Sequence, residues 1–346
     1  MQINAIKLHH FFSAVCLFSC SLATLTPHAA QINTQKNYQE SASLLLHYTA
    51  QERLRAGLQS KTLDLNGIRW RYSEGGPTHK PTLLLLHGLA GNRDHWNRVA
   101  EYLTPYYHVI IPDLPCNGET TVPQKFDHSI PNVAAQLRQF VEKLGVQDRL
   151  NIAGHSLGGS IATVYAAEYA FDTQSLFLLN STGIYKYAST HYTRNPQSLK
   201  DLIVYKPGDL DEVMAEMMQN PPRLPSKIKV AKERELMARA GETVQMIDQL
   251  IMLNRIYTPD SFARLTRSVE APTLILWGKQ DKIIHADAAL ELQALLKRAE
   301  KPVLLNNVGH VPMLEAEQQV AQYYLPFLAK TQQLKNPLLD KLIPLN

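Results

Sequence analysis

Short, continuous apolar runs recur along the chain from about residue 81, and turn-forming residues bound each run. Runs of this length are typical of strands that helices cover on both faces. Between the runs, segments such as 129–144 have the apolar spacing of helices. The alternation predicts an α/β fold with a mostly parallel, doubly wound sheet. The predicted strands are residues 82–86, 108–112, 150–153, 176–179, 273–277 and 303–305.

Two runs of alternating apolar and polar residues, within residues 62–72, precede this region and meet at Asn66-Gly67. Asn-Gly is the strongest short signal for a β-hairpin, because the tight turn needs residues that tolerate positive φ angles. The pattern therefore predicts an antiparallel hairpin at one edge of the sheet.

The strand rhythm stops between residues 183 and 269, where helical segments surround a proline cluster at 221–225. An insertion of this size after a strand predicts a helical cap over the carboxyl ends of the strands, where ligands bind in such folds. Its methionines fit either helix packing or an adaptable apolar acyl pocket. They are five of the chain's eight: Met214, Met217, Met218, Met246 and Met252.

The predicted α/β core is therefore split into residues 61–182 and 270–330, on either side of the 183–269 cap. We expect residues 31–60 to form an N-terminal extension, a polar connector followed by a helix, and residues 331–346 to form a C-terminal tail.

The first 30 residues have the character of a secretory signal peptide, with Lys7 ahead of an apolar run over residues 11–25. A retained membrane anchor is the alternative, although the run is short for a bilayer. Export would place the protein in the periplasm, outside the cell or on a membrane. The tetrapeptide ending in Cys20 resembles a bacterial lipobox, so a lipidated Cys20 would tether the chain.

Charge and cysteine content narrow the possible partners and cross-links. Charged residues make up 19% of the chain, and the net charge of +4 is spread out rather than gathered into basic blocks. Nucleic acid is therefore not an expected partner. Cleavage beyond Cys20 would leave Cys116 as the one cysteine, so the mature chain could form no internal disulfide.

An apolar strand from Leu150 runs into a serine framed by glycines and then into a segment rich in small residues. This is the G-x-S-x-G pattern of a nucleophile elbow, a turn that strains the serine backbone and exposes its hydroxyl. The motif is Gly154-His155-Ser156-Leu157-Gly158.

A serine hydroxyl becomes nucleophilic when a histidine takes its proton and a carboxylate orients that histidine. Asp281 and His310 follow the two predicted strands after the cap, in the order Ser, acid, His that this elbow uses. Asp113, which ends another strand, is held as the alternative acid. We interpret His87 and His155 as structural residues.

The oxyanion formed by serine attack needs N–H donors, and two backbone positions are predicted to supply them. One is Leu157, directly after the nucleophile, and the other is Leu89, in the loop after residues 82–86. Such chemistry needs no metal ion and no other cofactor.

Together, five motifs give the stretch from about Leu63 to Leu328 a resemblance to the α/β-hydrolase superfamily. Within it, the chain is most similar to exported bacterial lipases and esterases of the cold-adapted lipase type. Cys116 departs from the glycine usual in such relatives. The motifs are His87-Gly88, Asp113-Leu114-Pro115, Gly154-His155-Ser156-Leu157-Gly158-Gly159, Trp277-Gly278-Lys279-Gln280-Asp281 and Val308-Gly309-His310-Val311-Pro312-Met313.

This resemblance implies a serine carboxylic-ester hydrolase with a small-molecule or lipid ester as substrate. Two other functions stay open, because fold alone does not determine function. One is a serine hydrolase that cleaves carbon–carbon bonds of ring-fission products. The other is a ligand-binding protein that keeps the three residues but hardly turns over.

Overall fold

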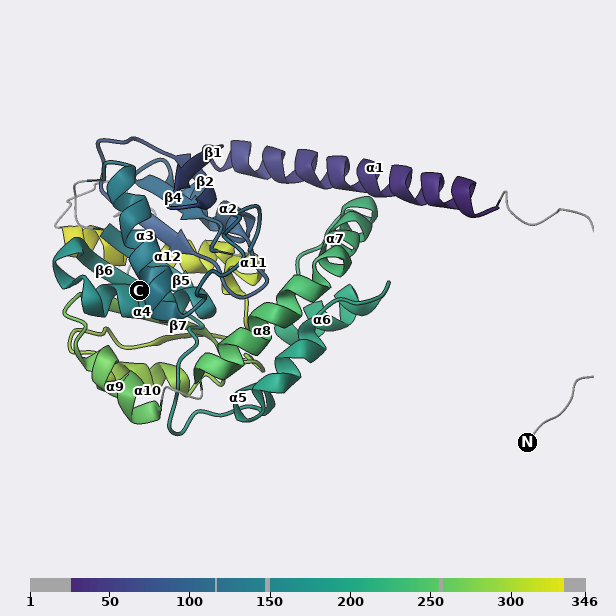
Figure 1. Ribbon diagram of the computed structural model, residues 1–346. Coiled ribbons are helices and arrows are strands. Elements are labelled where there is room, and N and C mark those ends of the chain that lie inside the picture. The colour runs from purple at the N-terminus through teal and green to yellow at the C-terminus, as the bar shows by residue number, and fades with distance from the viewer. Residues whose placement is uncertain (1–25, 116, 147–149, 255–257, 333–346) are drawn as a thin grey trace, which may run out of the picture. The chain divides into compact units, whose positions relative to one another are not determined.

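The computed structural model describes residues 26–115, 117–146, 150–254 and 258–332 (Figure 1). The chain divides into two units, Met1–Glu40 and Ser41–Asn346, and the second contains the sheet. Of the predicted leader, residues 1–30, the first 25 residues lie outside the described part of the chain. So do Cys20, Cys116 and the tail from residue 333.

One eight-stranded sheet organises the second unit, with the strand order β1-β2-β4-β3-β5-β6-β7-β8. The pairs β1–β2 and β2–β4 are antiparallel, and every later pair is parallel. The predicted α/β class with a mostly parallel, doubly wound sheet is confirmed. The strands are β1 Leu58–Leu65, β2 Ile68–Gly75, β3 Thr82–Leu86, β4 His108–Pro112, β5 Leu150–His155, β6 Thr173–Leu179, β7 Thr273–Gly278 and β8 Val303–Leu305.

The central strands are apolar throughout because successive side chains enter two separate cores. In β3, Leu84 and Leu86 join the core under helices α3 (Ile130–Lys143) and α4 (Leu157–Glu168). Leu83 and Leu85 join the core under helices α2 (Asn97–Leu103) and α12 (Glu317–Gln332). Successive residues of a strand point to opposite faces, so a sheet covered on both faces needs an uninterrupted apolar run.

The hairpin expected at the sheet edge is present as β1 and β2. Its turn residues, Asn66 and Gly67, have φ angles of 53° and 78°. Two consecutive positive φ angles match the turn type whose twist suits a two-residue hairpin. This prediction is confirmed.

Helices connect the strands and cover both faces of the sheet (Figure 1). The α-helices are α1 Thr26–Arg55, α2 Asn97–Leu103, α3 Ile130–Lys143, α4 Leu157–Glu168, α5 His191–Arg194, α6 Asp209–Met217, α7 Ser226–Ala238, α8 Ala240–Asn254, α9 Pro259–Arg267, α10 Ala288–Leu295, α11 Pro312–Glu315 and α12 Glu317–Gln332. Three short 3-10 helices are η1 Arg93–Trp96, η2 Ala170–Asp172 and η3 Pro196–Leu202.

The predicted polar connector before the first helix is wrong, because α1 is continuous over 30 residues. Between Pro27 and Gly57 the sequence has no glycine or proline, so nothing local breaks the helix. Within the described part of the chain, no helix is both long enough and apolar enough to cross a membrane.

Helices α5 to α9 and η3 fill the segment between β6 and β7, which we call the insertion (residues 183–269). A small cluster of its own, around Ile203, Ala240 and Ile247, joins η3 to α8. Helix α9 instead contacts α4 and α10. Within the insertion, η3 and α8 thus pack against each other, whereas α9 packs against helices of the α/β core.

Candidate active site

Ser156 stands at the junction of β5 and α4 in a strained conformation, with φ 50° and ψ −121°. The turn is so tight that it leaves no room for a side chain at either of the two flanking positions, which are both glycine. A Cβ at Gly154 would lie 2.2 Å from the Gly158 carbonyl oxygen, and one at Gly158 would lie 2.6 Å from the Leu86 carbonyl oxygen. The predicted elbow geometry is therefore present.

The three residues predicted to act together meet in one line of contacts. His310 Nε2 lies 3.0 Å from Ser156 Oγ, and His310 Nδ1 lies 2.9 Å from Asp281 Oδ2. All three residues are buried, with at most 6% of their surface exposed. This arrangement allows His310 to take a proton from Ser156 while facing a carboxylate.

Three hydrogen bonds, besides its contact with His310, hold Asp281 and fix its orientation. The backbone N–H groups of Ile283 and Ile284 donate to its Oδ1 at 2.8 and 2.9 Å. Asn180 donates to its Oδ2 at 2.7 Å. The motifs in the sequence do not single out Asn180, although an asparagine directly after a buried strand is a usable signal.

His155 and His87 both have structural contacts, as interpreted from the sequence. His155 Nε2 donates to the His310 carbonyl oxygen at 2.7 Å, and burial holds the pKa of His155 well below its usual value. His87 Nε2 accepts the Leu114 N–H at 2.9 Å. Burial also lowers the pKa of His87. Both rings are therefore neutral, and they hold backbone groups in place rather than acting as bases.

The two predicted oxyanion donors lie on segments that converge at Ser156. Leu157 begins α4, where the first N–H groups of a helix have no intrahelical partner. Leu89 follows Gly88, and a Cβ at Gly88 would lie 3.0 Å from Ser156 Cβ. The loop after β3 therefore passes close beside the serine.

Asp113, the alternative acid, is committed to another network. Its side chain pairs with Arg93 and accepts the N–H groups of Arg93 and Glu119 at 2.7 and 2.8 Å. Asp113 is fully buried, and Arg93 is 2% exposed. The structure thus gives the contact with His310 to Asp281.

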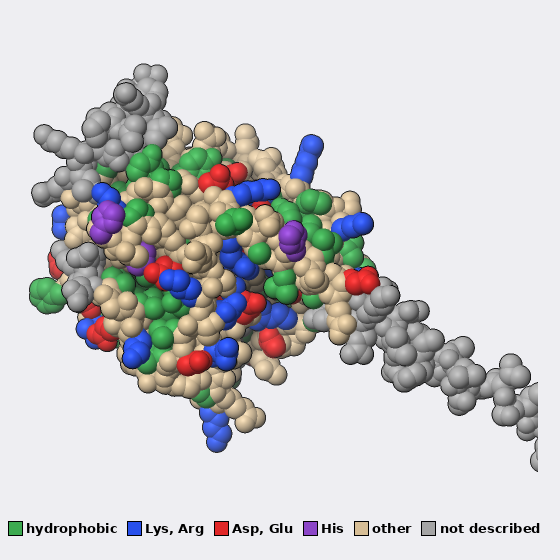
Figure 2. Space-filling model, turned by 90° about the horizontal axis from the view of Figure 1, so that it is seen from above, with side chains coloured by type: hydrophobic (Ala, Val, Ile, Leu, Met, Phe, Trp, Pro, Cys, Tyr) green, Lys and Arg blue, Asp and Glu red, His purple; other side chains and the backbone are tan. Residues whose placement is uncertain are grey.

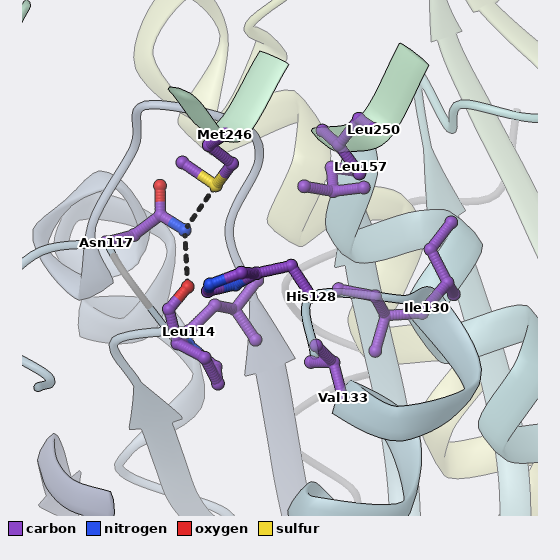
Figure 3. Close-up of a pocket in the computed structure, with 10 residues that line it drawn as sticks. Leu114, Asn117, His128, Ile130, Val133, Leu157, Met246 and Leu250 are labelled. Carbon is purple, nitrogen blue, oxygen red and sulfur yellow. Dashed lines mark hydrogen bonds between the residues drawn. The ribbon is translucent and has the colours of Figure 1, made fainter. Parts of the chain in front are cut away.

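A mostly apolar cavity lies beside Leu157, between the core and helix α8 (Figure 3). Figure 3 shows Met246 and Leu250 reaching it from the insertion, opposite Leu157 at the start of α4. Asn117 supplies a polar edge, with its Nδ2 donating to the Pro115 carbonyl oxygen at 3.2 Å. The lining residues are Leu114, Pro115, Asn117, His128, Ile130, Val133, Leu157, Ile161, Met246 and Leu250.

Of the five methionines in the insertion, Met246 lines this cavity, whereas Met217 packs against both cores. Met252 is 66% exposed. The two interpretations of the methionines therefore apply to different residues.

Basic and acidic side chains are interspersed, with apolar side chains between them, on the face seen in Figure 2. Among the residues that the structure describes, no three histidine, cysteine or acidic side chains are grouped as ligands for a metal ion.

Comparison with known proteins agrees with this architecture. The model of the alpha/beta hydrolase fold family matches residues 81–317. The chain belongs to the α/β-hydrolase family. The matched residues include strands β3 to β8, the elbow and the loops that hold Asp281 and His310.

Three relatives show what this α/β hydrolase is similar to. Lipase 1 of Psychrobacter immobilis is 29% identical over 316 residues, which are 90% of this chain and 94% of that protein. The crystal structure of a lipase candidate from Acinetobacter baumannii is 56% identical, with a TM-score of 0.82; the match covers 84% of this chain and 97% of that one. A membrane phospholipase A described as a bacterial virulence factor is 31% identical, with a TM-score of 0.80, over 88% and 96% of the two chains.

Proposed function

We propose that the chain is a serine carboxylic-ester hydrolase that acts on acyl esters. Ser156 is the nucleophile, His310 the general base, and Asp281 the carboxylate that orients His310. The observation that carries this proposal is the contact line from Ser156 Oγ through both nitrogens of His310 to Asp281 Oδ2, with distances of 3.0 and 2.9 Å.

Catalysis proceeds through an acyl-enzyme. His310 Nε2 takes the Ser156 proton as the oxygen attacks the ester carbonyl, and then returns that proton to the leaving alcohol. Asp281 stabilises the imidazolium that forms between these steps. Water repeats the sequence on the acyl-enzyme and releases the acid. The Leu89 and Leu157 N–H groups bind the negative oxygen in both tetrahedral intermediates.

Lipid esters are the proposed substrate class. The named relatives are lipases and a phospholipase, which supports an acyl ester with a hydrocarbon chain. The cavity beside Leu157 is lined mostly by apolar side chains, which suit a hydrocarbon chain that starts near the Leu157 N–H. We also propose that residues 183–269 act as the cap, since Met246 and Leu250 close this cavity from the insertion.

Export is part of the proposal, with residues 1–30 as a leader. Bacterial lipase relatives, one of them a membrane phospholipase, support export. A lipid on Cys20 is the finer version, in which the mature protein is tethered to a membrane. Intact-mass analysis of the protein purified from its native host tests this: an acylated Cys20 at the new N-terminus is expected, and an unmodified N-terminus elsewhere overturns the tether.

Hydrolysis of a p-nitrophenyl ester series from acetyl to palmitoyl tests the proposed reaction. We expect Ser156→Ala to lower kcat by at least about 10⁴-fold. Ser160→Ala is the matched control, because Ser160 lies in the first turn of α4, directly after the elbow, and its hydroxyl donates to the Thr182 carbonyl oxygen rather than facing His310. It should keep its activity.

The chain-length profile separates the remaining possibilities. A serine-dependent optimum at long chains identifies a lipase, and activity limited to short chains identifies an esterase. Absence of turnover on every ester would overturn the proposal in favour of the carbon–carbon hydrolase or the binding protein.

A further inference from the structure

Glu315, at the end of α11, gathers backbone N–H groups from two segments that are far apart in sequence. Its Oε1 accepts from Val311 at 3.1 Å, and its Oε2 accepts from Gly309 at 3.0 Å. The same Oε2 accepts from Gln219 and Asn220 at 2.7 and 3.1 Å. One carboxylate thus joins the loop on both sides of His310 to the insertion, just after α6.

The His310 backbone itself is held in the same seam. Its N–H donates to the Met217 carbonyl oxygen at 2.7 Å, and its carbonyl oxygen accepts from His155. Packing there is tight, because a Cβ at Gly309 would lie 2.6 Å from the Met217 oxygen. The end of α6 therefore packs directly against the main chain of Gly309 and His310.

The acid loop touches the same end of α6. Lys282, next to Asp281, bonds Glu216 Oε2 at 3.2 Å and the Ala215 carbonyl oxygen at 3.4 Å. Residues 215–220 of the insertion thus contact the loops of both His310 and Asp281. These hydrogen bonds are directional. The position of residues 215–220 therefore sets the positions of the Asp281 and His310 loops relative to each other.

We propose that Glu315 is a positioning residue that couples the insertion to the general base. Its carboxylate bridges the backbone on both sides of His310 to residues 219–220. These hydrogen bonds keep the His310 ring directed at Ser156. This inference rests on the proposed ester hydrolysis. A neutral amide would supply one acceptor oxygen and would turn an NH₂ group toward N–H donors, so it would open one side of the lock.

Glu315→Gln tests the coupling, with Glu291→Gln as the matched control. Glu291 is also a core-helix carboxylate that holds the insertion, since it accepts the N–H groups of Lys186, Tyr187 and Ala188. Among the residues that the structure describes, the hydrogen bonds of Glu291 go to these three N–H groups and not to residues 309–311. The two substitutions therefore make the same chemical change, with and without access to His310.

We expect Glu315→Gln to lower kcat at least tenfold with KM within threefold, and Glu291→Gln to leave both nearly unchanged. The low-field proton resonance of the His310–Asp281 hydrogen bond, assigned by its loss in His310→Ala, should broaden or vanish in Glu315→Gln alone. Glu315→Asp, which keeps the carboxylate, should recover part of kcat. Unchanged kcat and resonance in Glu315→Gln, or equal losses in both glutamine variants, would overturn the coupling.

A second variant covers the case in which Glu315→Gln does not fold. Gly309→Ala places a methyl group against the Met217 oxygen and so separates the seam without touching any charge. It should lower kcat and weaken the resonance in the same way, and an unaltered resonance would contradict the coupling. Failure of the proposed function would be seen separately, as full ester turnover in Ser156→Ala. The two failures are distinguishable because the resonance is recorded without substrate.

Discussion

Asn180 lies within 2.7 Å of Asp281 and fixes the carboxylate that faces His310. Its Nδ2 donates to Asp281 Oδ2 and also to the Gly309 carbonyl oxygen, while its Oδ1 accepts the Gly278 N–H. It has a positive φ of 45°, a conformation that asparagine tolerates better than most residues. One side chain thereby ties the end of β6 to the loops of the acid and the base.

Asn180→Ala should lower kcat/KM by about 10- to 100-fold, the equivalent of losing hydrogen bonds to a charged group. Asp281 would keep its two backbone donors but lose the group that sets its tilt toward His310. Steady-state kinetics on a p-nitrophenyl ester, corrected for active-site concentration, measures the effect. Asn180→Asp should be more severe at neutral pH, because two carboxylates would share one site. A wild-type rate in either variant would contradict this positioning role.

Local signals explain what could be predicted from the sequence. Asn66-Gly67 specifies its turn by backbone conformation, and the glycines around Ser156 specify the elbow by steric exclusion. Asp281 and His310 could be placed because parallel strands end at the same edge of a sheet. Each of these inferences needs a few neighbouring residues and one rule of topology.

The contacts that could not be predicted join segments far apart in sequence. The end of a buried strand marks Asn180 as a candidate, but nothing local indicates that its partner is Asp281. Likewise, nothing near Glu315 indicates that it binds residues 219–220. The start of α1 could not be predicted for a different reason, which is local. A polar sequence without breakers is compatible with both helix and coil, and local composition does not decide between them.

Asp113→Asn should damage stability rather than chemistry. Removing one partner of a buried ion pair leaves the Arg93 charge partly uncompensated, and the expected loss is about 3 kcal/mol in the free energy of unfolding. Urea unfolding measures this loss, and titration of Ser156 with a fluorophosphonate counts the folded sites. kcat per titrated site should stay near wild type. A drop of about 10³-fold in kcat with normal stability would instead give Asp113 the role of the carboxylate that orients the general base.

Glu74 links stability to acid pH. It bonds His108 Nε2 at 2.8 Å and Lys61 Nζ at 2.7 Å, and the His108 contact is the main cause that lowers the pKa of Glu74 to about 2. The folded-state pKa is below the ordinary value of 4.5, so the ionised form stabilises the fold above pH 4.5. That stabilisation, about 3 kcal/mol, is lost as the pH falls from 4.5 toward 2.

Urea unfolding of the wild type and Glu74→Gln at several pH values checks this linkage. The difference in free energy of unfolding between the two proteins should shrink as the pH falls below 4.5. A difference that does not change down to pH 3 would show that Glu74 has its ordinary pKa in the folded protein.

Filling the cavity beside Leu157 should shorten the preferred acyl chain. Val133 lines the cavity from α3 and is 5% exposed, so Val133→Phe would place a ring in the space proposed for the hydrocarbon chain. Val141→Phe is the matched control, because Val141 is equally buried on the same helix but does not line the cavity. Both variants carry a similar overpacking cost of about 1–3 kcal/mol, so stability alone does not separate them.

The ratio of kcat/KM values for long and short p-nitrophenyl esters is the quantity to compare. It should fall in Val133→Phe, since a long chain loses its apolar contacts and a short chain does not reach the new ring. It should keep its wild-type value in Val141→Phe, because a general loosening of the core lowers both rates together. An equal change of the ratio in the two variants would mean that the acyl chain binds elsewhere.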